Sequence, residues 1–161
     1  MKHGRKPKSE YGEKLAEKKV LKETYGLREK QFRRYFAKNQ NPESVFKTLE
    51  TRFDSLVYRC GFAQTRKAAH QLVSHGHIQI NGSNANLPSM HLKINDVVSI
   101  HPSSLSIAPF KEIQLTLKKY EPPSWIALDK QNLTAKMIAL PASDDPLLMA
   151  SIKPVMELYS R

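Results

Sequence analysis

A change of hydrophobic periodicity between residues 65 and 82 constrains the fold most. From Thr65 to Gly76 apolar residues recur at helical spacing, and threonine is a residue type that caps helix N-termini. The next residues alternate between polar and apolar as in a half-buried strand, and Asn81-Gly82 is typical of a two-residue hairpin turn. The sequence therefore predicts a short helix, a glycine stop, a strand and a tight hairpin in succession.

The rest of the chain also mixes the two periodicities. Apolar residues at helical spacing predict helices at 10–24, with Ser9 as its cap, at 27–38, at 42–60 and from 146 onward. Alternation predicts strands at 97–100 and 113–117, and a pair of strands at 125–129 and 134–140. Pro154 lies inside the last helix, where proline is expected to end or kink it.

Charge is the strongest global feature of these 161 residues. They carry 26 Lys and Arg against 15 Asp and Glu, a net charge of +11, and residues 1–38 hold thirteen of the cations and only five of the acids. A field of this sign attracts polyanions such as nucleic acid. No apolar run approaches the ~18 residues that span a bilayer, and the N-terminus lacks the apolar core of a secretory signal, so an intracellular protein without a membrane partner is expected.

The sequence contains few features that would indicate a catalytic site or a metal site. Cys60 is the single cysteine, so an intramolecular disulfide and a thiolate-based zinc site are excluded. His70, His75 and His77 are separated by five and then two residues, which does not match the i, i+4 pair of a helical zinc motif. With no catalytic triad or glycine-rich phosphate loop, we expect no catalytic residues, no metal and no cofactor.

Several polar and cationic faces are candidates for phosphate contacts. Lys14, Lys18 and Lys22 recur every four residues, and a face of one sign is typical of a polyanion-binding helix. Arg52 and Arg59 lie away from the apolar stripe of their helix, which predicts that they are free to reach a partner. On the helix after Thr65, the face opposite the apolar one consists of Lys67, His70, Gln71 and Ser74.

Four segments carry a resemblance to a known family. TRKAAHQLVSHGHIQING resembles the core motif of the S-four (S4) RNA-binding domain. YGLREKQFRRYF, LETRFDSLVYRCGF and the terminal ELYSR are similar to small-subunit ribosomal proteins of the S-four family, in the same order and over nearly the whole chain. The chain resembles a short form of that family, starting near its HG-RK segment without the N-terminal segment that many bacterial members carry.

The resemblance implies an α+β fold made of a mainly helical first domain and an inserted S4 domain with helices packed on a small β-sheet. The expected boundaries are 1–44 for a helical domain with a basic N-terminal arm, 45–123 for the S4 domain, and 124–161 for a C-terminal segment that returns to the helical domain. It further implies a structural protein that binds small-subunit ribosomal RNA at a helical junction and nucleates subunit assembly.

The same resemblance implies partners and a location within the ribosome. Ribosomal protein five is the expected protein partner, at an interface linked to decoding accuracy, and the basic segment would border the site where messenger RNA enters the subunit. The expected location is a ribosome, in the bacterial cytoplasm or in a mitochondrion or plastid.

RNA contacts are expected at the positions that match the family's motifs and on the cationic and polar helix faces. These residues are Arg5, Lys6, Lys8, Lys14, Lys18, Lys22, Arg28, Gln31, Arg33, Arg34, Arg52, Arg59, Thr65, Arg66, Lys67, His70, Gln71, Ser74, His75, His77 and Asn81.

Two other functions remain open from the sequence. An RNA-modifying enzyme such as a pseudouridine synthase can use an S4 module to position its substrate, but it needs a separate catalytic domain for which few residues remain. A free-standing S4-domain factor of the heat-shock or ribosome-rescue kind needs no catalytic domain.

Overall fold

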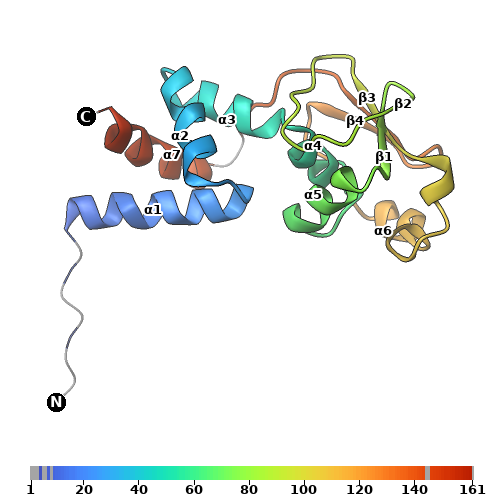
Figure 1. The fold of residues 1–161 in the computed structure, drawn as a ribbon, viewed down its shortest axis with the longest axis horizontal. Helices are drawn as coiled ribbons and strands as arrows, with labels where there is room; N and C mark the ends of the chain where they lie inside the picture. The colour runs from blue at the N-terminus through green and yellow to red at the C-terminus, as the bar shows by residue number, and fades with distance from the viewer. Residues whose placement is uncertain (1–3, 5–6, 8, 144–145, 161) are drawn as a thin grey trace. The chain divides into compact units, whose positions relative to one another are not determined.

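The structure is a computed structural model that describes residues 4, 7, 9–143 and 146–160. The described residues divide into two compact units, and the division falls within one helix (Figure 1). The helical unit comprises the residues up to Phe46 and those from Ser143 onward, and the sheet unit comprises Lys47–Ala142. Helices and one antiparallel sheet give an α+β fold, which confirms the predicted fold class. None of the described helices is long and apolar enough to span a membrane.

The helical unit contains α1 (Glu10–Tyr25), α2 (Glu29–Lys38), the start of α3 (Pro42–Glu50) and α7 (Pro146–Tyr159). The Ser9 hydroxyl accepts a hydrogen bond from the backbone N–H of Gly12 at 3.1 Å, so the predicted cap of α1 is confirmed. Helix α7 packs against α1 and α2. The rings of Phe32, Phe36 and Tyr159 form the centre of this core, with the Phe36 and Tyr159 centroids 5.4 Å apart.

Pro154 does not end the last helix. Helix α7 continues through it to Tyr159, so the proline does not terminate the helix. A proline inside a helix costs about 3 kcal/mol, because it removes one backbone hydrogen bond and crowds the preceding turn. Ile152 and Val155, on either side of Pro154, are fully buried, and burying such side chains contributes about 1.5–3 kcal/mol each. The packing of the helix therefore offsets the proline.

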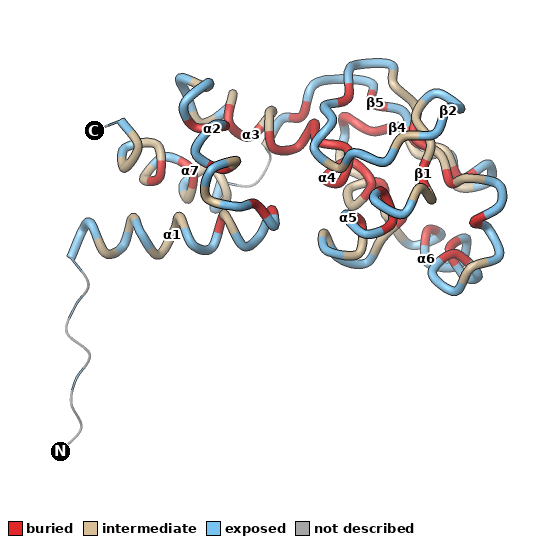
Figure 2. Tube along the Cα trace, viewed as in Figure 1, coloured by how far each residue is buried: buried red, intermediate tan, exposed pale blue. Residues whose placement is uncertain are grey.

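The sheet unit holds one sheet whose strand order is β2-β1-β3-β5-β4, with every neighbouring pair antiparallel. The strands are β1 (Ile78–Ile80), β2 (Ser83–Asn84), β3 (Val97–Ile100), β4 (Ile126–Asp129) and β5 (Thr134–Met137). The other elements of this unit are α4 (Phe53–Arg59), α5 (Arg66–Ser74), α6 (Ile113–Lys118) and the short 3-10 helices η1 (Pro102–Ser104) and η2 (Ala108–Phe110). Its buried residues lie in α4 and α5 as well as in the strands (Figure 2).

The predicted hairpin is confirmed. Ile80 pairs with Ser83, so Asn81 and Gly82 form a two-residue turn, and their φ angles of +51° and +78° are those of a type I′ turn. The Asn81 amide oxygen also accepts a hydrogen bond from the backbone N–H of Val97 at 2.9 Å, which ties the turn to the start of β3.

Two predicted elements differ from the structure. The helix expected over 42–60 breaks at Thr51 and Arg52, because the Thr51 carbonyl accepts from Leu92 N–H at 2.8 Å and Phe53 N–H donates to the Met90 carbonyl at 2.7 Å. The strand expected at 113–117 is helix α6 instead. Its buried residues, Ile113 and Leu117, are four apart, and the apolar residue between them is exposed to solvent.

The boundary expected at residue 123 also differs from the division in the structure. Strands β4 and β5 belong to the sheet unit, and only the residues from Ser143 onward group with the helical unit. The reason is the pairing of β3 with β5, in which Val98 lies opposite Ala135 and both are buried. A strand pair placed elsewhere would leave this edge of β3 without hydrogen-bond partners.

Candidate nucleic-acid interface

The outer face of α5 is exposed as predicted. Thr65 caps the helix by accepting from the Ala68 N–H at 3.0 Å, and the apolar residues Ala69, Leu72 and Val73 are buried. The residues of the opposite face, namely Lys67, His70, Gln71 and Ser74, are all exposed, and so is His75 at the end of the helix. An ammonium group, imidazoles, an amide and a hydroxyl are therefore available together at one surface, and all of them can donate hydrogen bonds to phosphate or ribose oxygens.

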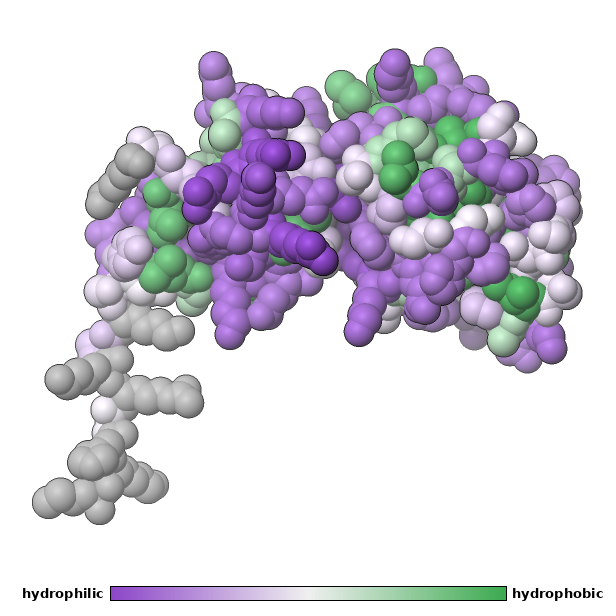
Figure 3. Space-filling view, in the orientation of Figure 1, coloured by the Kyte–Doolittle hydropathy of each residue, from purple (hydrophilic) through white to green (hydrophobic). Residues whose placement is uncertain are grey.

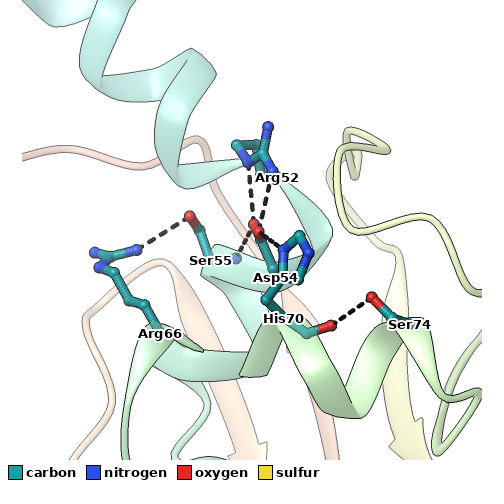
Figure 4. Close-up of polar contacts among 6 residues, drawn as sticks. All are labelled: Arg52, Asp54, Ser55, Arg66, His70 and Ser74. Atoms are coloured by element: carbon teal, nitrogen blue, oxygen red, sulfur yellow. Dashed lines mark hydrogen bonds and ion pairs between the residues drawn. The ribbon is translucent and has the colours of Figure 1, made fainter. Parts of the chain in front are cut away.

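A buried carboxylate holds this face from beneath (Figure 4). Asp54 accepts hydrogen bonds from Arg52 Nε at 3.1 Å, from Arg52 Nη2 at 3.0 Å and from the Ser55 backbone N–H at 2.7 Å. His70 Nδ1 lies 3.2 Å from the Asp54 Oδ2 atom, which anchors one edge of the imidazole ring. The His70 side chain is 54% exposed, so it is both anchored and accessible.

Arg52 is not free to reach a partner. Its side chain is 2% exposed and is paired with Asp54, so the expectation of an outward arginine is wrong. The cause is the break between α3 and α4, which turns residue 52 away from the helical position that the periodicity implied. Arg52 neutralises the buried Asp54 charge instead.

A second buried carboxylate anchors Arg59 and Arg66. Glu50 is fully buried and accepts two hydrogen bonds from Arg59, at 2.8 and 2.9 Å, and one from Arg66 Nη2 at 3.0 Å. Arg66 also donates to the Ser55 hydroxyl at 3.1 Å and lies over the Tyr58 ring, 4.8 Å from its centroid. The two arginine side chains stay 28% and 14% exposed, and their guanidinium groups are held in fixed positions by Glu50.

The remaining predicted residues of this motif have mixed surroundings. His77 Nδ1 lies 2.8 Å from the Ser104 hydroxyl, whereas the Asn81 amide donates to Asp96 Oδ1 at 3.0 Å as well as accepting from Val97. The Asn81 side chain therefore makes hydrogen bonds that hold the hairpin turn in place. In the described part of the chain, no three His, Cys, Asp or Glu side chains are arranged to hold a metal ion.

The lysines along one face of α1 form ion pairs within the helical unit. Lys14 Nζ lies 3.1 Å from Glu157, and Lys18 and Lys22 lie 2.7 and 3.2 Å from the two carboxylate oxygens of Glu29. The hydrogen bond from Lys18, with that from Lys22, lowers the pKa of Glu29 to about 2. The face is therefore an ion-pair network within the helical unit, and contacts of these lysines with phosphate stay a prediction.

Helix α2 and its N-cap residue Arg28 also supply exposed cations in the helical unit. Arg28, Arg33 and Arg34 are exposed, and Gln31 between them is half-buried. Arg33 lies 3.6 Å from Glu29, yet its side chain remains 66% exposed. On the face shown in Figure 3, hydrophilic side chains cover most of this unit, with apolar side chains in small patches. The basic-arm residues Arg5, Lys6 and Lys8 lie outside the described residues.

Comparison with known proteins decides the family. The family model "Ribosomal protein S4/S9 N-terminal domain" matches residues 1–52, and "S4 domain" matches residues 51–98. The small ribosomal subunit protein uS4 of Caldicellulosiruptor bescii is 42% identical over 166 residues, covering 99% of this chain and 80% of the relative. The Aquifex aeolicus protein is 41% identical over 169 residues, and the Syntrophomonas wolfei protein 39% over 164, with coverage of 80% and 78% of those relatives. The chain belongs to the uS4 family.

Membership of the uS4 family also bears on the alternatives that the sequence left open. The relatives are named as proteins of the small ribosomal subunit, and they match nearly the whole chain rather than the S4 domain alone. This chain is therefore a structural ribosomal protein and not an RNA-modifying enzyme.

Sequence reasoning missed two residues that hold the candidate interface in place. Glu50 lies in the helix predicted over 42–60, and Ser104 lies outside the predicted elements; neither was singled out. Glu50 is buried with two arginines, and Ser104 is 4% exposed beneath His77. The sequence does not show that Glu50 is buried, because its partners Arg59 and Arg66 are nine and sixteen residues away and meet it only in the folded chain.

Proposed function

We propose that this uS4 protein binds small-subunit ribosomal RNA through the outer face of α5 and the exposed cations of α2. One observation carries the proposal: the exposed donors of α5 stand on two buried carboxylates, Asp54 and Glu50, that fix His70 and Arg66. Fixed donors lose little entropy on binding, and folded RNA is recognised mainly through phosphates, 2′-hydroxyls and shape.

The proposed target is a junction of RNA helices, and the proposed role is to nucleate subunit assembly. A protein with separate cationic surfaces on two units can contact more than one helix of a junction. The helical unit and the sheet unit are accordingly proposed as two RNA-binding domains. The resemblance to the S-four family supports this proposal, because it implies that both domains contact a junction of ribosomal RNA helices.

Two finer roles rest on the resemblance alone. Contact with ribosomal protein five would link the chain to decoding accuracy, and Arg5, Lys6 and Lys8 would border the site where messenger RNA enters. The matched relatives named above are bacterial, which favours a bacterial ribosome over that of a mitochondrion or plastid.

Nuclease footprinting of the purified protein on its small-subunit ribosomal RNA tests the proposal. We expect protection confined to the helices of one junction. Protection scattered along the RNA would show a general basic RNA binder and would contradict the proposed role in assembly. A deletion of residues 1–8 is expected to leave the junction protected, because the arm is assigned to messenger RNA.

A further inference from the structure

A groove at the end of α4 lies outside the face of α5. Its volume is about 440 Å³, and its lining includes Tyr58, Gln64, Lys119 and Tyr120. Sites of roughly 300–1,000 Å³ accept small ligands or parts of larger ones. All of its lining residues belong to the sheet unit, and Arg59 is the one lining residue that is also among the RNA contacts predicted from the sequence.

Tyr120 is held in place as one wall of this groove. Its hydroxyl donates to the backbone carbonyl of Arg59 at 2.6 Å. Its ring lies against Gly61, where a Cβ atom would come within 2.8 Å of the ring Cδ1 atom, and the φ of Gly61 is +85°. Burial raises the pKa of Tyr120, so the hydroxyl stays protonated and keeps this hydrogen bond. The ring is thus fixed at its hydroxyl and along one edge.

Tyr58 provides a second fixed aromatic ring. The guanidinium carbons of Arg66 and Arg59 lie 4.8 and 5.7 Å from its centroid, within cation–π distance. Both arginines are in turn bonded to the buried Glu50. The Tyr58 ring therefore needs no rearrangement to receive a ligand.

The other lining groups are polar or cationic. Lys119, Gln64 and Thr116 are exposed at the groove. Within the described part of the chain, no carboxylate lies at ion-pair distance from the Lys119 ammonium group. An aromatic face, an amide and an ammonium group match the three parts of a nucleotide: the base plane, the base edge and the phosphate.

We propose that this groove binds one unpaired nucleotide of RNA, with its base stacked on Tyr120 and its phosphate at Lys119. The inference rests on the proposed RNA-binding function and adds a site for a single unpaired base to it. Stacking on an aromatic side chain accepts any base, so the groove would read the unpaired state of the nucleotide rather than its sequence.

Binding of the oligonucleotide pentauridylate to the full chain at physiological salt tests the site. The Tyr120→Leu variant is expected to bind about 5- to 150-fold more weakly, the loss typical of one stacked base. The Tyr120→Phe variant keeps the ring and is expected to stay close to wild type. Tyr11→Leu is the matched control, because Tyr11 is 62% exposed in the helical unit.

Charge at the groove is tested separately with Lys119→Gln and its exposed neighbour Lys118→Gln. Only the first is expected to lower the slope of log K against log salt, by about 0.7 for one phosphate of a single strand. If circular dichroism shows that Tyr120→Leu is unfolded, these two lysine variants still test the proposal. Equal slopes for the two variants would overturn it.

Chemical probing of ribosomal RNA in complex with Tyr120→Leu separates the possible sources of the nucleotide. One newly reactive base, with the junction still protected, assigns it to ribosomal RNA. Unchanged probing with weakened pentauridylate binding assigns it to another single strand. If Tyr120→Leu matches wild type in both measurements, the groove is not a nucleotide site, although the junction footprint would still stand.

Discussion

The Oδ2 atom of Asp54 lies 3.2 Å from Nδ1 of His70 and also accepts the Nη2 bond of Arg52. One buried carboxylate therefore holds an exposed imidazole on one side and a buried guanidinium on the other. The arrangement joins the stability of the sheet unit to the shape of its outer surface.

Replacing Asp54 by Asn should destabilise the protein by about 3–5 kcal/mol, because Arg52 would remain buried without an opposite charge. Urea unfolding followed by circular dichroism measures this change. Glu112→Gln is a suitable control, since Glu112 is exposed and makes no side-chain capping bond, so its removal should change stability by less than about 0.5 kcal/mol. Equal midpoints for the two variants would contradict the structural role of Asp54.

Glu29 should make the helical unit sensitive to acid. Its pKa is lowered from 4.5 to about 2 by Lys18 and Lys22, so its contribution to stability is complete above about pH 4.5 and is lost as the pH falls toward 2. The measurement is thermal unfolding between pH 6 and pH 2. The Glu29→Gln variant should lose less stability over this window than the wild type, whereas Glu23→Gln, at an exposed position, should follow the wild-type curve.

Lys18 and Arg34 should separate stability from RNA affinity. Lys18→Gln breaks the 2.7 Å ion pair with Glu29 and should lower the unfolding midpoint, with little effect on RNA binding. Arg34→Gln removes an exposed cation of α2, so it should leave unfolding unchanged and lower the salt slope of RNA binding by about 0.9. The opposite pattern in unfolding and filter-binding assays would restore the α1 lysines as the RNA face.

Cys60 should be inert in the folded protein. Its side chain is fully buried, and burial raises the pKa of its thiol far above the usual range, so almost no thiolate forms near neutral pH. A thiol reagent such as dithionitrobenzoate should react only after denaturant is added. Rapid labelling of the native protein would show that α4 opens locally.

Local signals allowed part of this fold to be predicted. The caps at Ser9 and Thr65 and the turn at Asn81-Gly82 depend on residues within four positions of each other, and each was predicted correctly. Residues 113–117 are too few to separate the two periodicities, so a helical turn was taken for a strand.

Other features were missed because they depend on residues that are distant in the sequence. The break at Thr51 needs backbone bonds to residues 90–92, and the partners of the α1 lysines lie on α2 and α7. A single sequence shows the cations of a helix face but not the acids that fold against them. The outward face of α5 was predicted because it follows from the periodicity of one helix. The burial of Arg52 was not predicted because it follows from the break between α3 and α4.

The most direct test of the account is the salt dependence of binding to a ribosomal RNA fragment that contains the protected junction, for the wild type and for a Lys67→Gln, Gln71→Ala double variant of α5. The account predicts weaker binding by the variant and a slope of log K against log salt smaller by about 0.9, with an unchanged circular dichroism spectrum. Identical affinities and slopes for the two proteins would contradict the assignment of α5 as the RNA-binding face.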